Sequence, residues 1–312
     1  MMISAIVPLY NEEESLEKLY PRLKSALNKL KIEHEIVFVD DGSSDSSLQI
    51  LKKLASKDNT VKIYSLRKHS GKSEALTYGF KKAAGDYVVT LDADLQDRPE
   101  EIQNLLDKSR EGFELVSGWR KNRKDSLHMK IPSKFFNFLM GAFWGVHLHD
   151  YNCGLKLYTK EAAKSLRLYG GMHRFIPLLV SEKGFEVTEI PVVHEPRLYG
   201  RSKYGFSKVF KDIPDMFTIL FLTKYAKRPL HFFGLTGGIL SAIGSLILLY
   251  LVVLKLLGET IGGRPLLTFG MLLVLVGLQI LFTGFIADLI INLNEKNKLD
   301  EEAEDELKFK SE

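Results

Sequence analysis

The chain has 312 residues and a formal net charge of +4, which leaves room for one sizeable α/β domain and a smaller part. So mild a charge, without an arginine-rich stripe, argues against nucleic acid as a partner. The single cysteine, Cys153, excludes an internal disulfide framework and is typical of a reducing compartment. The mean hydropathy is near zero because a charged region up to about Arg228 is followed by a very apolar one.

Strand-like and helix-like segments alternate through the N-terminal part of the chain. Short β-branched runs indicate strands, and leucines spaced three and four apart indicate helices. The predicted strands are 3–8, 35–39, 61–66, 87–91 and 115–119, and the predicted helices are 12–30, 48–54 and 73–84. This alternation predicts a parallel, doubly wound α/β sheet, whose ligands bind at the carboxyl ends of the strands. Because residues 1–8 lead directly into a strand, we expect no signal peptide there.

Two aspartates, Asp92 and Asp94, follow the fourth predicted strand directly. In an extended or turning backbone their carboxylates can converge on one point, and hard oxygen ligands of this kind suit Mg²⁺ or Mn²⁺. The alternative is a pair of turn or cap aspartates before a helix that Pro99 opens. Asp97 is interpreted as such a helix N-cap, with a role behind the metal ligands as its own alternative.

Further polar clusters lie at the ends of other predicted strands. They comprise Tyr10, Asn11 and Glu12 after the first strand, and Asp40 and Asp41 after the second. Since the carboxyl ends of parallel strands meet at one edge of a sheet, this shared location favours a ligand site over simple capping.

The chain is less regular between the fifth predicted strand and the apolar tail. We predict a basic loop at 120–130, an aromatic helix at 134–144 in the core or against lipid headgroups, and a polar loop at 197–204. The segment with His149, Asp150 and Cys153 is interpreted as a structural loop, because no second ligand pair accompanies it. Asp150 could still border a donor sugar.

Bulky apolar residues recur every three or four positions between 206 and 221, with charged residues among them. This spacing predicts an amphipathic helix within 206–228 that either lies in a membrane interface or packs against the sheet. The two alternatives are equal on periodicity alone, and the apolar runs that follow favour the membrane.

Two long apolar runs, 230–254 and 266–291, each exceed the roughly 20 residues needed to cross a hydrocarbon core. The short connection at 258–264 predicts a helical hairpin over 229–293, followed by a charged, solvated tail at 294–312.

Basic residues flank both runs on the same side: Lys224, Lys227, Arg228, Lys296 and Lys298. This bias places both ends of the hairpin and the large domain in the cytoplasm, at the cytoplasmic membrane of a prokaryote. Gln279, midway along the second run, could hydrogen-bond between helices within or between subunits. The glycines and serines of the first run permit close helix packing, and we expect a homo-oligomer.

Five short motifs occur in one order along the chain: VPLYNE at 7–12, VDDGSSD at 39–45, GK at 71–72, LDADLQD at 91–97 and RLYGRSK at 197–203. Together they resemble the family 2 glycosyltransferases with the GT-A fold, over about residues 3–205. The chain looks closest to the polyprenyl-phosphate hexose synthases, such as dolichyl-phosphate mannosyltransferases and bacterial polyprenyl-phosphate glucosyltransferases. The resemblance implies a Rossmann-like, cytoplasmic GT-A domain over residues 1–205 that binds a nucleotide-sugar donor.

The resemblance also implies roles for individual residues. Those that would contact the nucleotide sugar are Pro8, Tyr10, Asn11, Glu12, Asp40, Asp41, Lys72 and Asp92. Asp94 and Gln96 would ligate Mg²⁺ or Mn²⁺, with Asp92 close to the metal.

The implied acceptor is a polyprenyl phosphate at the membrane. The residues predicted to bind its phosphate are Arg120, Lys130, Ser133, Arg197, Arg201, Ser202 and Lys203. The family usually carries an arginine or a basic pair before an Ile-x-Ser element. Here Lys130 precedes Ile131 and Ser133. A lysine ammonium, which binds phosphate as a point charge, therefore replaces a planar guanidinium that could donate two hydrogen bonds to it. The predicted catalytic residues are Asp92, Asp94, Lys130 and Arg197.

A divalent ion would neutralise the leaving nucleoside diphosphate as a Lewis acid. A sugar hydroxyl as acceptor would need a general base, whereas a phosphate monoester has its second pKa at about 6 and is already anionic near neutral pH. We therefore predict a single in-line displacement with inversion, from a donor of UDP-glucose or GDP-mannose type, giving a polyprenyl-phosphate hexose.

Two other functions remain open. A processive polysaccharide synthase would share the aspartate pair, but this chain lacks the Gln-x-x-Arg-Trp signature of such enzymes. A catalytically silent membrane scaffold would not need Lys72, Asp92, Asp94 and Gln96, all of which are present.

Overall fold

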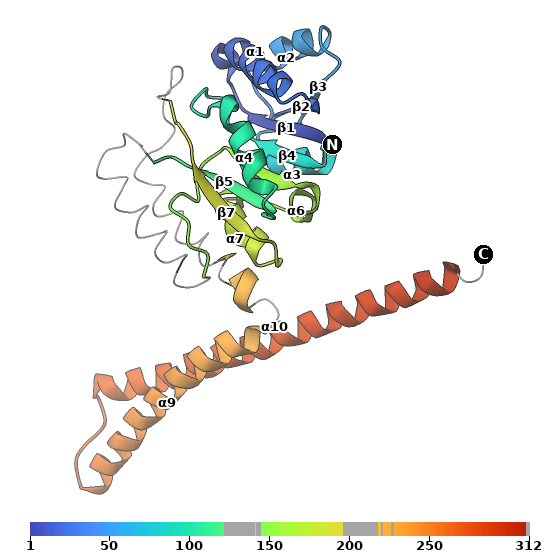
Figure 1. Cartoon of the computed structure of the whole chain (residues 1–312). Helices are drawn as coiled ribbons and strands as arrows, with labels where there is room; N and C mark the ends of the chain where they lie inside the picture. Colours follow the sequence, from blue (N-terminus) through green and yellow to red (C-terminus); the bar gives the residue numbers. More distant parts are fainter. Residues whose placement is uncertain (122–140, 142–144, 196–217, 220, 226–227, 310–312) are drawn as a thin grey trace. The chain divides into compact units, whose positions relative to one another are not determined.

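A computed structural model describes residues 1–121, 141, 145–195, 218–219, 221–225 and 228–309 of the chain (Figure 1). The chain divides into two compact units, Met1–Met216 and Phe217–Glu312, and each is described by itself.

Seven strands of the first unit form one mixed sheet in the order β3-β2-β1-β4-β6-β5-β7. Their bounds are β1 Met2–Leu9, β2 Glu33–Asp40, β3 Val61–Ser65, β4 Tyr87–Thr90, β5 Leu115–Trp119, β6 Lys156–Thr159 and β7 Val187–Pro191. The five strands predicted in the N-terminal part are confirmed. The expectation of an all-parallel sheet is wrong at β6, which runs antiparallel to both β4 and β5.

Helices connect and cover the strands (Figure 1). Their bounds are α1 Glu13–Lys29, α2 Ser47–Ala55, α3 Lys72–Lys82, η1 Pro99–Glu101, α4 Ile102–Ser109, α6 Lys160–Ser165, η2 Met172–Phe175 and α7 Ile176–Ser181. Helix α1 buries Leu16, Leu19, Leu23 and Leu27 completely, which confirms the predicted helical spacing. Each such side chain contributes about 1.5–3 kcal/mol on burial.

The close approach of α3 to β1 depends on Gly79. A Cβ at this position would lie 2.6 Å from Cγ2 of Ile6 and 3.4 Å from Cγ2 of Val39. Glycine therefore lets the helix that begins at Lys72 sit directly on the two strands that end beside it.

Strands β1, β2 and β4 are parallel, so their carboxyl ends lie at the same edge of the sheet. Leu9 pairs with Asp40, and Ile6 pairs with Thr90. Strands β1 and β2 therefore end level, while β4 ends beside Ile6, so that the residues after β4 lie next to the last residues of β1.

The second unit contains a short π-helical turn, η3 (Phe221–Tyr225), and two long helices, α9 (Pro229–Leu256) and α10 (Pro265–Phe309). Helix α9 and the segment Pro265–Leu293 of α10 are long and apolar enough to cross a membrane. Only 11% of the apolar window in each is buried, which is unlike the core helix of a soluble domain. The predicted hairpin helices are therefore present.

The two long helices pack through glycine. A Cβ on Gly237 would lie 2.5 Å from the carbonyl oxygen of Gly277, and one on Gly277 would lie 2.3 Å from Oγ of Ser241. The small residues of α9 thus permit close contact within the hairpin, as their packing role predicts.

Several expectations fall partly or wholly outside the described residues. Of the aromatic helix predicted at 134–144, only Gly141 is described, and of the amphipathic helix at 206–228 only 218–219, 221–225 and 228 are. The backbone of the charged tail is helical as far as Phe309, as the end of α10.

Candidate active site

The loop after β4 carries the aspartate pair, and its own carboxylates hold it in shape. Oδ1 of Asp94 accepts a hydrogen bond from the backbone N of Gln96 at 3.2 Å. Oδ2 of Asp97 accepts one from the backbone N of Asp92 at 3.3 Å. Leu95, with φ 64° and its side chain buried, adopts the left-handed conformation that lets the loop turn this tightly.

Asp97 is not a helix N-cap, so that prediction is wrong. The residue before η1 is Arg98, and no side chain caps the helix. The buried carboxylate of Asp97 instead reaches back along the loop to Asp92 and lies 3.7 Å from Nδ1 of His194. Asp97 thus holds the loop through the backbone of Asp92, and its alternative role behind the metal ligands stays a prediction.

Lys72 forms an ion pair with Asp92. Its ammonium, on the first residue of α3, donates to Oδ1 of Asp92 across the edge of the sheet. Desolvation alone would raise the pKa of Asp92, but the charge and hydrogen bond of Lys72 outweigh it and lower that pKa below the usual value. Asp92 is therefore a carboxylate at neutral pH, and its negative charge is compensated by the protein.

The oxygen ligands that the loop offers fit a hard divalent cation. Asp94 and Gln96 offer a carboxylate and an amide oxygen two residues apart, and Asp92 lies in the same turn. In the described part of the chain no group of three or more His, Cys, Asp or Glu side chains could hold a metal by itself. A cation here would therefore share its coordination between this loop, water and the oxygens of a diphosphate, as Mg²⁺ commonly does.

Asp40, the last residue of β2, and Asp41, which follows it, are buried, and their carboxylates accept hydrogen bonds from within the protein. Asp40 accepts hydrogen bonds from the backbone N of Ser43 at 3.0 Å and from Oγ of Ser65 at 2.8 Å. Asp41 accepts from the backbone N of Ser70 and of Gly71, each at 2.8 Å. These carboxylates fix the loops around the edge of the sheet. Their predicted contacts with the nucleotide sugar stay predictions.

The segment after β1 joins the same loops. The backbone N of Asn11 donates to Oγ of Ser43 at 2.9 Å, and Oδ1 of Asn11 accepts from the backbone N of Ser44 at 2.8 Å. The backbone N of Glu12 donates to Oγ of Ser47 at 2.9 Å. The VPLYNE and VDDGSSD motifs are therefore parts of one structure.

Tyr10 stacks on His69, with ring centroids 4.0 Å apart and planes at 22°. Nδ1 of His69 lies 2.8 Å from Oδ2 of Asp41. His69 was not predicted from the sequence, because it belongs to none of the five motifs. His69 is exposed and Tyr10 is partly buried, so the stack adds an aromatic surface to the edge where the nucleotide sugar is predicted to bind.

Asp92 also lines a small polar cavity of about 20 Å³, which has room for about one water. Its lining includes Pro8, Lys72, Asp92, Lys156 and His173. Lys156 is 3% exposed, and its ammonium donates to the carbonyl oxygen of Cys153. Burial lowers the pKa of Lys156, while burial and the charge of Lys72 lower the pKa of His173 to about 3. Sequence reasoning missed both residues, which lie far from every motif along the chain.

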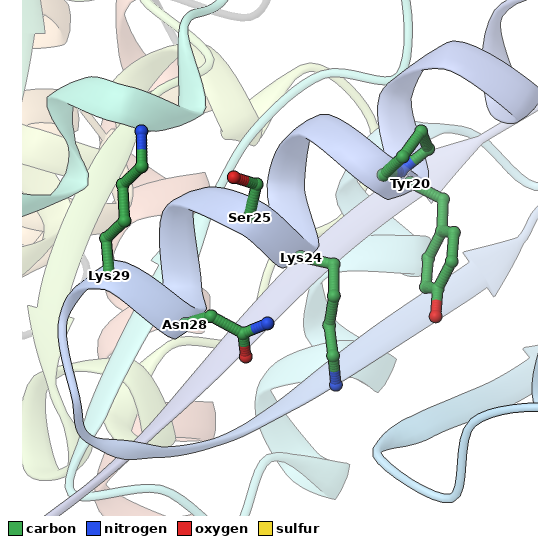
Figure 2. Close-up of a pocket in the computed structure, with 6 residues that line it drawn as sticks. Tyr20, Lys24, Ser25, Asn28 and Lys29 are labelled. Atoms are coloured by element: carbon green, nitrogen blue, oxygen red, sulfur yellow. The ribbon is translucent and has the colours of Figure 1, made fainter.

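A larger hollow of about 520 Å³ lies elsewhere, on α1 (Figure 2). It is lined by Tyr20, Pro21, Lys24, Ser25, Asn28 and Lys29. A helix that follows a parallel strand runs back towards the amino ends of the sheet, so these later turns of α1 lie away from the ligand edge. The candidate active site is therefore the smaller cavity and the loops around it.

Arg120 is held by Asp150. Its Nε lies 2.6 Å from Oδ2 and its Nη2 lies 2.9 Å from Oδ1, with both side chains only about a tenth exposed. His149 stacks on Trp119 with centroids 4.1 Å apart, and its ring also contacts Glu189. These contacts hold the 149–153 segment in place, as expected of a structural loop.

The role of Arg120 with the acceptor stays a prediction. The other residues predicted to contact the acceptor lie outside the described residues: Lys130, Ser133, Arg197, Arg201, Ser202 and Lys203.

The mixed sheet with acidic loops at its carboxyl edge is the architecture of GT-A glycosyltransferases. The model of glycosyl transferase family 2 matches residues 4–167, and the chain belongs to this family. It is a glycosyltransferase, which confirms the resemblance drawn from the motifs.

Relatives match nearly the whole chain. The dodecaprenyl-phosphate galacturonate synthase of Rhizobium johnstonii is 40% identical over 294 residues, covering 92% of this chain and 87% of that protein. The undecaprenyl-phosphate 4-deoxy-4-formamido-L-arabinose transferase of Proteus mirabilis is 35% identical, covering 92% and 88%. Both matches therefore extend past the sheet unit into the apolar helices.

Among solved structures, glucosyl-3-phosphoglycerate synthase of Mycobacterium tuberculosis, in complex with Mn²⁺ and uridine-diphosphate-glucose, has a TM-score of 0.53 and 19% identity. The match covers 70% of this chain and 78% of that one. At this identity the likeness shows the fold.

Proposed function

We propose that the chain transfers a sugar from a nucleotide sugar to a polyprenyl phosphate, giving a polyprenyl-phosphate sugar and a nucleoside diphosphate. The observation that carries the proposal is the Asp92–Gln96 loop at the ligand edge of a GT-A sheet, in a chain that also has two apolar helices of membrane-spanning length. Two relatives that match over 92% of the chain are named for sugar transfer to polyprenyl phosphates, which supports the acceptor class.

The donor is proposed as a nucleotide sugar without restriction to glucose or mannose. The relatives are named for galacturonate and for 4-deoxy-4-formamido-L-arabinose, so they support the class of reaction and not the particular hexose predicted above. An acidic or amino-modified sugar accordingly belongs in any donor panel beside UDP-glucose and GDP-mannose.

Asp94 and Gln96, with Asp92 beside them, would hold Mg²⁺ or Mn²⁺, and the mycobacterial structure with Mn²⁺ and a nucleotide sugar supports this choice of ion. A divalent cation bound there would neutralise charge on the departing diphosphate. Lys72 compensates the charge of Asp92, and its ammonium would also contact a diphosphate oxygen.

The acceptor phosphate would attack the anomeric carbon directly, with inversion. Its oxygen is already anionic near neutral pH, so no side chain has to remove a proton. The pairing of Asp92 with Lys72 and of Asp150 with Arg120 supports this mechanism, because both carboxylates are held as ion pairs. The role of the chain is to orient the two phosphate groups and to exclude water.

The hairpin is proposed to span the cytoplasmic membrane of a prokaryote, with the sheet unit on the cytoplasmic side, on the basis of the flanking cations. We also propose that the chain self-associates through α10. Gln279 lies at the midpoint of Pro265–Leu293, about 21 Å of helix from either end, and its side chain is exposed. A carboxamide both donates and accepts hydrogen bonds, so the same residue of a second copy complements it in hydrocarbon.

The experiment combines the full chain in detergent with a polyprenyl monophosphate, Mn²⁺ and a panel of radiolabelled nucleotide sugars. We expect one donor to label the lipid with a single sugar and the Asp94→Ala variant to give almost no product. A labelled polymer would indicate a polysaccharide synthase. Absence of any labelled product with every donor would point to the silent scaffold and overturn the proposal.

A further inference from the structure

A segment almost a hundred residues away in the sequence lies against the Asp92–Gln96 loop. His194 forms an isolated antiparallel β-bridge with Asp97. The backbone N of Glu195 donates to the carbonyl oxygen of Gln96 at 2.9 Å, and Nε2 of Gln96 donates to the carbonyl oxygen of Glu195 at 3.4 Å. The backbone of Glu195 therefore orients the side-chain amide of Gln96 by accepting a hydrogen bond from its Nε2.

Two arginines hold Glu195 in place. Its carboxylate accepts hydrogen bonds from Nη1 and Nη2 of Arg22 at 2.9 and 3.0 Å, and from Nε of Arg98 at 2.6 Å. Arg22 lies on α1, and Arg98 directly follows the loop. Paired, charge-assisted hydrogen bonds of this kind fix both position and direction.

We propose that Glu195 is a positioning residue for the divalent cation. An amide whose nitrogen donates to the carbonyl of Glu195 has its oxygen turned away from that carbonyl, and this oxygen would be the ligand that Gln96 contributes beside Asp94. The two arginines hold the carboxylate of Glu195 and so fix the position of its backbone. The carbonyl oxygen of that backbone then determines the orientation of the Gln96 amide. This inference rests on the proposed function, because it takes Asp94 and Gln96 as metal ligands.

The alternative is a purely structural ion network that joins α1 to η1. Arg22 supports this alternative as well, since its Nε and Nη2 also lie 2.8 and 3.0 Å from the carboxylate of Glu100. Glu100 thus shares the same arginine, yet no hydrogen bond joins it to Gln96 among the described residues. Glu100→Gln is therefore a matched control for Glu195→Gln: each removes one carboxylate from Arg22, and only one of them bears on the amide.

The test measures Mn²⁺ binding to the full chain in detergent by the electron paramagnetic resonance of free Mn²⁺, with uridine or guanosine diphosphate present. We expect Glu195→Gln to raise the dissociation constant of Mn²⁺ at least tenfold, the usual effect of removing a residue behind a metal ligand. Glu100→Gln should change it less than twofold. In turnover assays Glu195→Gln should raise the Mn²⁺ concentration for half-maximal rate, with kcat recovering at saturating Mn²⁺.

Equal changes for the two variants, or a lower unfolding temperature of Glu195→Gln with unchanged Mn²⁺ affinity, would overturn the inference in favour of the structural network. If Glu195→Gln does not fold, Arg98→Gln takes its place, because it removes one anchor and leaves the Arg22 pairs intact. A wild-type chain that binds no Mn²⁺ with either diphosphate would instead contradict the metal site itself. The failures of the inference and of the proposed function are thereby distinguishable.

Discussion

The two units place polar and apolar groups in opposite ways. In the sheet unit, Asp40, Asp41 and Asp97 are at most 4% exposed, and each accepts hydrogen bonds from backbone N–H groups. In the hairpin, large apolar side chains such as Leu246 and Ile286 are at least 60% exposed, while glycines occupy the contact between the helices. A buried carboxylate is stable only when its oxygens are hydrogen-bonded or ion-paired, whereas so continuous an apolar surface along two helices is stable when it faces hydrocarbon. The sheet unit therefore depends on specific polar contacts, and the hairpin depends on close backbone packing.

The largest effect is expected at the aspartate pair. Asp94→Ala should lower the rate of sugar transfer about 10²–10³-fold, because it removes a buried carboxylate that both shapes the loop and is proposed to bind the metal. Transfer assays with the labelled donor measure the change. Asp107→Ala, at an exposed position on α4, is the control and should leave the rate unchanged. A nearly normal rate for Asp94→Ala would refute the proposed site.

The packing of the hairpin can be broken separately. Gly277→Leu should lower the free energy of unfolding by about 1–3 kcal/mol, because the new side chain would occupy the space of Ser241 and of the backbone of Gly237. Gly238→Leu is the matched control, since a Cβ there meets no atom within 4 Å. Thermal unfolding of both variants in detergent checks this, and equal losses would contradict the observed packing.

The ion network of the sheet unit predicts a pH dependence. Hydrogen bonds from Arg22 are the main cause that lowers the pKa of Glu195 to about 2 from an ordinary 4.5. Since the folded pKa is depressed, the stabilising contribution is complete above pH 4.5 and is lost as the pH falls towards 2. Near pH 7 the wild type should be about 1 kcal/mol more stable than Glu195→Gln. This difference should shrink as the pH falls below 4.5 and disappear near pH 2. A difference that persists at the lower pH would contradict it.

The smallest effect is expected from the exposed amide of the hairpin. Gln279→Leu should weaken self-association by about 0.6 kcal/mol, the average for such polar contacts in a bilayer. Energy transfer between labelled copies in vesicles, measured over a range of lipid dilutions, resolves a shift of this size. Gln279→Asn, which keeps an amide, serves as the control. Unchanged association of the leucine variant would indicate that Gln279 does not face a second copy.

The sequence predicted those features that repeat locally. Five strands, the leucine face of α1, the acidic loop after β4 and the two apolar helices follow from periodicity, β-branched runs and motif spacing, because each depends on residues that are neighbours in the chain. The motifs in their order also predicted the family. The antiparallel direction of β6 was not predicted, since strand direction depends on how a long connection returns to the sheet.

Contacts between distant segments were decided by the tertiary structure alone. Lys156 and His173 line the same cavity as Asp92, His69 stacks on Tyr10, and Glu195 contacts Gln96. None of the motifs includes Lys156, His173, His69 or Glu195. A single sequence carries no local signal for such pairs, because their proximity results from the spatial order of the strands in the sheet. The sequence by itself determined which chemistry the chain carries at its motifs. The fold determined which other charges surround that chemistry, because burial and distance exist only once the strands are side by side.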